Sequence, residues 1–256
     1  MTETDPPSAT VINEAGASPV VLLCEHASNH IPPRYARLGL AEADLARHIA
    51  YDIGALPVAR HLSRRLDAVL VHSGYSRLLI DCNRPLAAPS SIPERSEDTA
   101  IPGNIGIDAA ERARRDALFF APFRERVATL LDARLRAGQP TLLIGMHSFT
   151  PVYLGVSRIW HAGMLYGRAH NLGRAMIAGL RASDPALVVG DNEPYRVTEE
   201  GDYTVPHQGD ARGIPTALIE VRQDLIGHAD GQEAWGERLA GVLAAIAADV
   251  VTVRER

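Results

Sequence analysis

The stretch Val20-Val-Leu-Leu-Cys24-Glu25-His26 begins with five apolar residues and ends in a carboxylate and an imidazole. Its apolar part is too continuous for a strand with one face in water, and such runs are typical of parallel strands covered on both sides. The pattern recurs at Thr141-Leu-Leu-Ile-Gly-Met146-His147. In open α/β folds, ligands bind beyond the carboxyl ends of the strands. The two stretches therefore predict one site at a shared edge of a sheet.

Strand-like and helix-like segments alternate along the rest of the chain. We expect strands at 20–24, 68–72, 78–82, 141–146, 186–189 and 214–221, a further candidate at 152–159, and helices at 41–50, 56–66, 109–137, 168–182 and 232–248. Pro122 should break or kink the longest helix. The alternation predicts an α/β fold with three layers, in which helices flank a mainly parallel mixed sheet. We expect a flexible N-terminus over residues 1–18 and a single domain over 19–256.

Composition excludes several function classes. The net charge of −5 gives no basic surface for nucleic acid, and the absence of lysine rules out a Schiff-base lysine or a phosphate-loop lysine. Cys24 and Cys82 are too few for a disulfide scaffold, and Cys24 lies in an apolar run, where a thiol is usually inert. The chain starts without a signal-like segment and has no apolar run of about 20 residues. We therefore expect a cytoplasmic protein that does not associate with membranes.

Two histidines and one acidic residue are the candidate metal ligands. A catalytic zinc site usually has three protein ligands and an open fourth position. His26 and His147 each close a predicted strand, and Asp52 lies where one predicted helix gives way to the next. Asn29 and Glu25 compete with Asp52 for the third position. An amide is a poor zinc ligand, and Glu25 points away from His26 if the strand pleat continues, which leaves Glu25 a supporting role.

A third strand also carries polar chemistry, in Ala217-Leu-Ile-Glu220-Val-Arg222. Burial raises the pKa of a carboxylate and suits Glu220 to general acid or base catalysis near neutral pH. Arg222 is two residues further on and shares a strand face with Glu220. Its guanidinium is suited to a substrate carboxylate, although a structural ion pair with Glu220 explains the spacing nearly as well.

Two long connections, 83–106 and 195–213, are candidate lids or binding loops, with mobile surface loops as the alternative. Arg84 directly follows a predicted strand and is a second candidate for binding a carboxylate. His207 could orient substrate or stabilise an oxyanion, and ordinary turn chemistry is an equal interpretation. Asn83 and Asn29 complete the candidate substrate contacts.

Several motifs together resemble the N-formylglutamate amidohydrolase family. The matches extend from about Val20 to Leu225 in one order, and the motifs include Cys24-Glu-His-Ala-Ser-Asn-His-Ile-Pro32, Tyr75-Ser-Arg-Leu-Leu-Ile-Asp-Cys-Asn-Arg-Pro85, Met146-His-Ser-Phe-Thr-Pro151 and Ile219-Glu-Val-Arg-Gln-Asp-Leu225. The family is similar in fold to zinc exopeptidases and muramoyl amidases, which share a phosphorylase/hydrolase-like core. The positions of the muramoyl amidase ligands and catalytic glutamate correspond here to His26, Asp52, His147 and Glu220, with Asp52 replacing a glutamate.

The resemblance implies hydrolysis of N-formyl-L-glutamate to formate and glutamate, the last step of one histidine-degradation route. It also implies one zinc ion per chain, Glu220 as the base, and Arg84 and Arg222 as partners of the substrate carboxylates. The remaining alternatives are another small N-acyl amino acid or amide as substrate, and a homologue that binds metal or carboxylate without catalysis. We expect a monomer or a homodimer.

Overall fold

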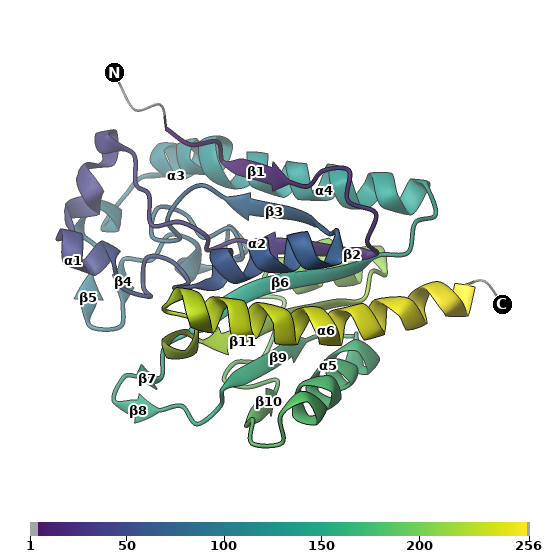
Figure 1. Cartoon of the computed structure of the whole chain (residues 1–256). Helices are drawn as coiled ribbons and strands as arrows, with labels where there is room; N and C mark the ends of the chain where they lie inside the picture. Colours follow the sequence, from purple (N-terminus) through teal and green to yellow (C-terminus); the bar gives the residue numbers. More distant parts are fainter. Residues whose placement is uncertain (1–4, 255–256) are drawn as a thin grey trace.

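The chain forms a seven-stranded mixed sheet with strand order β1-β3-β2-β6-β11-β9-β10 in the computed structural model, which describes residues 5–254 (Figure 1). The sheet strands are β1 (Ala9–Ile12), β2 (Val20–Cys24), β3 (Val69–Ser73), β6 (Leu142–Phe149), β9 (Ala162–Tyr166), β10 (Val189–Asp191) and β11 (Thr216–Arg222). The central strands β3, β2, β6 and β11 are parallel. At the two sides, β1 is antiparallel to β3 and β9 is antiparallel to β11.

Helices cover both faces of this sheet, which confirms the predicted three-layer α/β fold (Figure 1). The helices are α1 (Glu42–Leu45), α2 (Ala55–Leu66), α3 (Ala109–Arg115), α4 (Ala121–Arg136), α5 (His170–Ser183) and α6 (Ala229–Arg254). On one face α2, α5 and α6 pack together, and on the other face α4 packs against the half of the sheet that holds β1 and β3. Among the described helices, none combines the length and the hydrophobicity that a membrane span requires.

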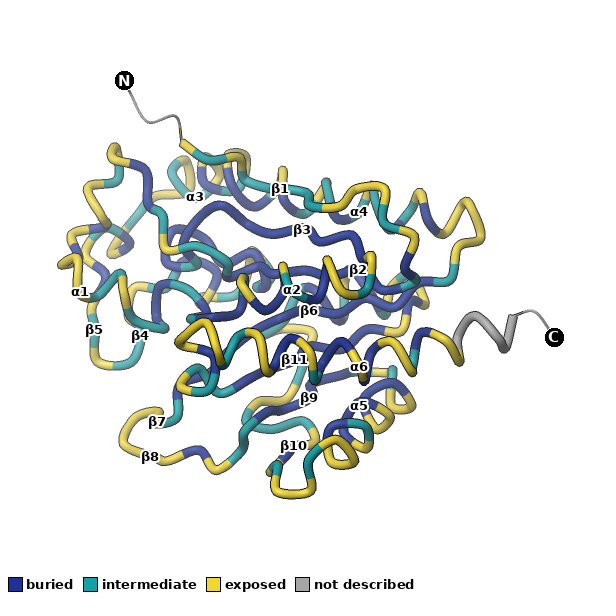
Figure 2. The backbone as a smooth tube through the Cα atoms, viewed as in Figure 1, coloured by how far each residue is buried: buried dark blue, intermediate teal, exposed yellow. Residues whose placement is uncertain are grey.

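The alternation of side chains along β2 shows why its sequence is apolar throughout. Val20, Leu22 and Cys24 belong to the core beneath α2 and α6, whereas Val21 and Leu23 belong to the core beneath α4. All five residues have no exposed surface, and the buried centre of the sheet is visible in Figure 2. Burial, together with nearby Asp52 and Glu25, raises the pKa of the Cys24 thiol well above its usual value. Cys24 is therefore an inert core residue, as expected.

The predicted elements agree with the structure for β2, β3, β6, β11, α2, α5 and α6. Within 41–50 only Glu42–Leu45 is helical, and the strand predicted over 186–189 begins at Val189. The segment 152–159 is a hairpin of two short strands, β7 (Val152–Tyr153) and β8 (Val156–Ser157). The strand β9 was not predicted.

The prediction of a strand at 78–82 is wrong. These residues form turns, and Leu78, Leu79 and Ile80 are buried in a second apolar cluster together with Tyr75 and Phe119. A short apolar run indicates burial but does not distinguish a strand from another buried segment. The segment therefore packs beside the sheet instead of extending it.

Part of the N-terminal segment 1–18, which we expected to be flexible, forms a strand. Residues 9–12 form β1, paired with β3 from Ala9 opposite Ser73 to Ile12 opposite Leu70. Thr10, Val11 and Ile12 are β-branched and half-buried, and such residues suit an edge strand. Residues 1–4 lie outside the described residues.

The long helical segment over 109–137 is interrupted near Pro122, as predicted. A π-helical turn (Asp116–Phe120) separates α3 from α4, and Pro122 lies in the first turn of α4. The Ala121 amide donates to the Asp116 carbonyl, five residues earlier. Proline has no amide hydrogen and cannot donate the usual α-helical hydrogen bond, so the helix is interrupted near Pro122. The wider π-helical turn provides this interruption.

A buried arginine on α3 holds the segment 79–104 in place. The Arg115 guanidinium donates to Leu79 O (3.1 Å), Gly103 O (3.1 Å) and Asn104 Oδ1 (2.7 Å), and its Nε donates to Glu111 (2.8 Å). Its side chain is only 2% exposed. The chain between residues 79 and 104 thus depends on one cation for several of its buried polar contacts.

Replacing Arg115 with methionine should lower the free energy of unfolding by about 3 kcal/mol, because buried acceptors without a donor cost about 1–3 kcal/mol each. The neighbouring Arg114 is 67% exposed and provides a matched control. Arg114→Met should change the free energy by less than about 1 kcal/mol, as is usual for exposed ion pairs. Urea denaturation followed by circular dichroism measures both, and equal effects of the two substitutions would refute the role given to Arg115.

Candidate functional site

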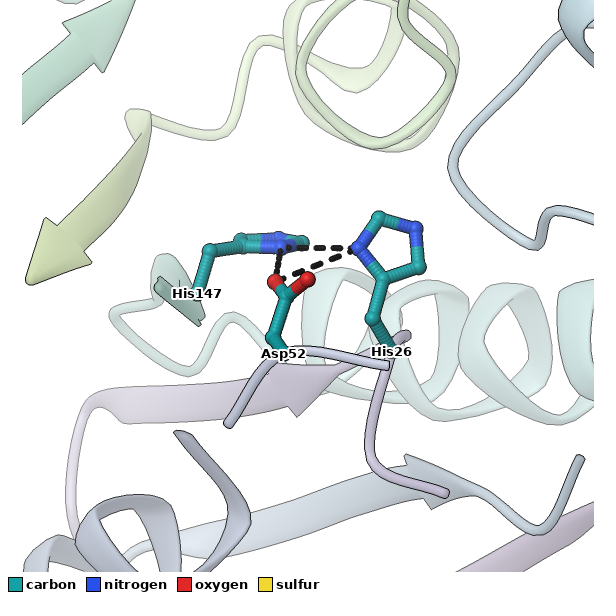
Figure 3. Close-up of side chains that lie close together, drawn as sticks. All are labelled: His26, Asp52 and His147. Carbon is teal, nitrogen blue, oxygen red and sulfur yellow. Dashed lines mark hydrogen bonds and ion pairs between the residues drawn. The ribbon is translucent and has the colours of Figure 1, made fainter. Parts of the chain in front are cut away.

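Three side chains from separate segments converge beyond the middle of the sheet (Figure 3). His26 lies two residues after β2, His147 lies in β6, and Asp52 lies in the turn before α2. Asp52 Oδ2 is 2.8 Å from His147 Nδ1 and 3.3 Å from His26 Nδ1, and the two Nδ1 atoms are 3.2 Å apart. All three side chains are buried. We call them the His26–Asp52–His147 cluster.

The turn before α2 holds Asp52 in position. The Asp52 amide donates to His26 O at 2.9 Å, and the amide of Ser148 donates to Asp52 Oδ2 at 3.3 Å. Two residues later Gly54 has a φ of 79°, and a Cβ there would lie 2.1 Å from Ile226 O. Only glycine fits this left-handed, tightly packed position. The turn therefore fixes the carboxylate against both histidines.

Further carboxylates contact the outer nitrogen atoms of the two histidines. Asp81 Oδ1 is 2.7 Å from His26 Nε2, and Glu25 Oε2 is 3.1 Å from His147 Nε2. Arg77 contacts both Asp52 (3.3 Å) and Asp81 (2.8 Å), and Thr204 donates a hydrogen bond to Glu25. A carboxylate on the outer nitrogen fixes the ring orientation and tautomer of a metal-binding histidine. Both Nδ1 atoms are thereby directed into the cluster.

Charge around the cluster favours ionised carboxylates. Burial alone would raise the pKa of Asp52, but His26 and His147 lower it well below its usual range. Glu25 is buried as well, and contact with His147 lowers its pKa. Burial opposes a charge on His147, yet Glu25 and Asp52 raise its pKa well above the usual value. The site therefore concentrates negative charge around two imidazole rings, as a cation site requires.

The His26–Asp52–His147 cluster could hold a metal ion. Two imidazole nitrogens and a carboxylate oxygen are a common donor set for catalytic zinc. With bonds of about 2.0–2.1 Å, tetrahedral donors lie about 3.3 Å from one another. The observed separations of 2.8, 3.2 and 3.3 Å are close to this value. The residues present thus fit a metal ion in both chemistry and spacing.

Glu220 lies beside the cluster because β11 and β6 are parallel neighbours. Their register places Glu220 directly opposite His147. Glu220 is buried, and its Oε2 has no hydrogen-bond partner within the described residues. Burial and the charge of Asp52 raise its pKa to about 7, against the opposing effects of His147 and His26. A cation in the cluster would favour the carboxylate form and lower this pKa.

A cavity of about 490 Å³ contains both the cluster and Glu220. Much of its remaining lining comes from the two long connections that the sequence singled out. The segment 83–106 contributes Arg84 and the β4–β5 hairpin (β4, Arg95–Ser96; β5, Thr99–Ala100), and the segment 195–213 contributes Tyr195, Arg196 and Asp202. Both long connections therefore border the cavity, and the volume suits a small molecule.

Two of the predicted substrate residues line this cavity, and both also connect the long loops. Asn83 Oδ1 accepts from the amides of Tyr203 (3.1 Å) and Thr204 (2.8 Å). Arg84 Nη1 donates to Gly201 O at 2.6 Å and Asp202 Oδ1 at 3.0 Å. Asn83 is thus committed to the loop, whereas Nε and Nη2 of Arg84 have no partner in the part of the chain that the structure describes.

Three predicted substrate residues, Arg222, Asn29 and His207, lie outside the cavity lining. Arg222 pairs with Asp224 (2.8 Å) where β11 ends, instead of with Glu220. Asn29 Nδ2 donates to Leu45 O at 2.8 Å, so its side-chain amide is engaged in a structural hydrogen bond. His207 stacks against Tyr203, and its Nε2 lies 3.4 Å from Glu199 O.

Arg77, Asp81, Tyr195 and Arg196 are among the polar residues of the cavity that sequence reasoning missed. Asp81 was hidden because the segment 78–82 was taken for a strand, in which its position beside His26 could not be inferred. Arg196 is exposed and makes no hydrogen bond or ion pair within residues 5–254. An arginine in a polar loop gives no sequence signal that separates a ligand contact from a solvated surface residue.

Two solved structures share this architecture, and a third, more distant structure was also found. The structure of gene product Atu2144 from Agrobacterium tumefaciens is 38% identical to this chain in sequence. The match covers 100% of this chain and 99% of the Atu2144 chain, with a TM-score of 0.90. An N-formylglutamate amidohydrolase from Ralstonia eutropha JMP134 is 19% identical over 95% of this chain and 98% of its own, with a TM-score of 0.60, and therefore shares the fold. An N-acetylmuramoyl-L-alanine amidase of Nostoc punctiforme is more distant, at 13% identity and a TM-score of 0.41 over 93% of this chain and 97% of its own.

The search of curated proteins gave no match. The model of one protein family, described as N-formylglutamate amidohydrolase, matches residues 18–227. This range contains the His26–Asp52–His147 cluster, Glu220 and both loops of the cavity. The family match confirms the resemblance predicted from the sequence motifs, and identifies an enzyme that hydrolyses a non-peptide amide bond. The chain belongs to the N-formylglutamate amidohydrolase family.

Proposed function

We propose that the protein catalyses zinc-dependent hydrolysis of N-formyl-L-glutamate to formate and glutamate. The observation that carries the proposal is the His26–Asp52–His147 cluster beside a buried, unpartnered Glu220 in one cavity. Family membership supports the same reaction. Hydrolysis of another small N-acyl amino acid and binding without catalysis are the alternatives. We place the enzyme in the cytoplasm and in histidine degradation, as a monomer or homodimer.

In the proposed mechanism, His26, Asp52 and His147 hold one zinc ion. Zinc, when bound, acts as a Lewis acid towards a carbonyl oxygen and lowers the pKa of a coordinated water to about 7. Glu220 accepts a proton from the attacking water and then returns it to the departing amide nitrogen. Arg77 and the buried carboxylates keep the histidines oriented throughout.

The substrate carries two carboxylates, and Arg84 and Arg196 are among the cavity arginines that have unused donors. Arg84 is half-buried and keeps Nε and Nη2 available, which suits it to the α-carboxylate next to the reacting amide. Arg196 is exposed at the cavity and has all its donors free within the described residues, which suits it to the more distant side-chain carboxylate. Arginine binds carboxylates through two parallel hydrogen bonds. The pair thus replaces the predicted pair of Arg84 and Arg222.

Substitution of Arg196 by glutamine should lower kcat/KM for N-formylglutamate about 10- to 100-fold, because a hydrogen bond to a charged group contributes about 1.5–3 kcal/mol. The same substitution should change kcat/KM for N-formylglutamine, which lacks the side-chain carboxylate, by less than about threefold. Arg64→Gln is the control, since Arg64 is exposed on α2 outside this cavity. Equal losses for both substrates would assign Arg196 to the α-carboxylate, and no loss for either would remove it from the substrate site.

The test of the function itself combines metal content with formate release. The purified protein is loaded with zinc and given formyl, acetyl and peptidyl derivatives of glutamate, aspartate and glutamine. We expect one zinc per chain and the highest kcat/KM for N-formylglutamate. A protein that binds no zinc, or that turns over none of the formyl amino acids, would refute the proposed function.

A further inference from the structure

Tyr195 carries a hydroxyl group into the cavity wall and has no role in the scheme above. It lines the same cavity as His147 and Glu220. Its hydroxyl oxygen accepts a hydrogen bond from Nη1 of Arg158 at 2.7 Å. The residue is 41% exposed, so part of its surface remains accessible to a ligand. A tyrosine that lines the cavity and whose hydroxyl is held by an arginine calls for a chemical explanation.

Arg158 is held firmly in this position. Its residue is only 9% exposed, and its amide donates to Pro151 O at 2.8 Å. The guanidinium carbon lies 4.6 Å from the ring centre of Tyr153 and 4.8 Å from that of Tyr195. Cation–π contacts with both rings restrain the guanidinium. The Nη1 donor therefore reaches the Tyr195 oxygen from a constant direction.

The direction of this hydrogen bond determines what the Tyr195 proton can do. A guanidinium has only donors, so the phenol oxygen must be the acceptor. The phenol hydrogen is then free for another partner, and it has no acceptor among the described residues. Burial and the charge of Glu220 raise the pKa of Tyr195 to about 12, against the opposing effect of Arg158. At neutral pH the phenol therefore keeps its proton as a hydrogen-bond donor.

We propose that the Tyr195 hydroxyl donates a hydrogen bond to the formyl oxygen of the substrate as that oxygen gains negative charge, and that Arg158 positions Tyr195 for this. The proposal rests on the proposed deformylase function. The proton stays on the phenol throughout, so the step forms and breaks no covalent bond. A fixed donor aimed at a developing oxyanion typically contributes about 10²–10³ in kcat. Tyr195 is thus a catalytic residue and Arg158 a positioning residue.

Replacing Tyr195 with phenylalanine removes only the hydroxyl and tests the proposal directly. In the zinc-loaded enzyme we expect kcat for N-formylglutamate to fall about 10²- to 10³-fold, with KM changed less than threefold and zinc content unchanged. Tyr35→Phe is the comparison, because Tyr35 does not line this cavity and its hydroxyl has no hydrogen-bond partner within the described residues. Its kcat should change less than threefold.

Arg158→Lys and the double variant with Tyr195→Phe test the positioning role. We expect Arg158→Lys to lower kcat at least tenfold with Tyr195 present, and less than twofold once the hydroxyl is absent. Thermal melting monitors folding of each variant. Independent, multiplying losses in the double variant would refute the positioning role. If the wild-type enzyme releases no formate, the proposed function is refuted. If the wild-type enzyme is active and Tyr195→Phe has the same kcat, only the role of Tyr195 is refuted.

Discussion

Substitution of Glu220 by glutamine is expected to lower kcat for N-formylglutamate about 10²- to 10⁴-fold, the usual contribution of a general base. Glutamine keeps the shape of the side chain but cannot accept the proton of the attacking water. Because Glu220 is not in the His26–Asp52–His147 cluster, the zinc content should stay at one per chain. Stability should not fall either, since the substitution removes a buried carboxylate whose Oε2 has no partner among the described residues.

Formate release and metal analysis on the same preparation provide the measurement. Glu233→Gln is the control, because Glu233 is exposed on α6 and does not line this cavity. It should match the wild type in kcat and in zinc content. If Glu220→Gln retains more than a tenth of the wild-type kcat, another group must serve as the base. If it loses its zinc, Glu220 contributes to the metal site itself.

Substitution of His26 by alanine is expected to remove zinc binding and reduce activity to the background rate. Two ligands remain, and two are too few for a stable catalytic zinc site. Folding should be retained, because Asp81 keeps its ion pair with Arg77 (2.8 Å) when the imidazole is absent. His228→Ala is the control, since His228 is exposed and distant from the cluster in the sequence.

Substitution of Asp81, whose carboxylate contacts Nε2 of His26, should weaken zinc binding less than His26→Ala does. Asp81→Asn should weaken zinc binding about 10- to 100-fold, as is usual when a partner of a metal-binding histidine is changed. At saturating zinc its activity should return, whereas His26→Ala should stay inactive. Competition with a chelator, followed by metal analysis, measures the affinity of each variant. Full zinc occupancy in His26→Ala would exclude His26 as a ligand.

The sequence was sufficient for the central strands and for the segments that meet at the cluster. Val20–Cys24 and 141–146 are apolar on both faces, which is enough to predict buried parallel strands, and the ends of parallel strands meet at one edge of the sheet. That geometry brings His26 and His147 together. Asp52 was one of three candidates for the third position, beside Asn29 and Glu25, and the structure places its carboxylate against both histidines.

The substrate residues depended on side-chain geometry that spacing does not contain. Arg222 shares a strand with Glu220, yet Asp224 two residues later provides a nearer partner for its guanidinium. Asp81 contacts His26 only because residues 78–82 turn, whereas their apolar character suggested a strand. Arg196 is distinguished by the absence of partners within residues 5–254, a property that exists only in three dimensions.

The contacts of Asn83 and Arg84 with residues 201–204 have a consequence for substrate size. Through them the two loops that border the cavity are joined, 117 to 121 residues apart in sequence. Widening the cavity from this side would break these hydrogen bonds together. In the proposed function, this restraint favours small acyl groups such as formyl over bulky acyl chains, and Arg84 and Arg196 select the amino-acid part of the substrate.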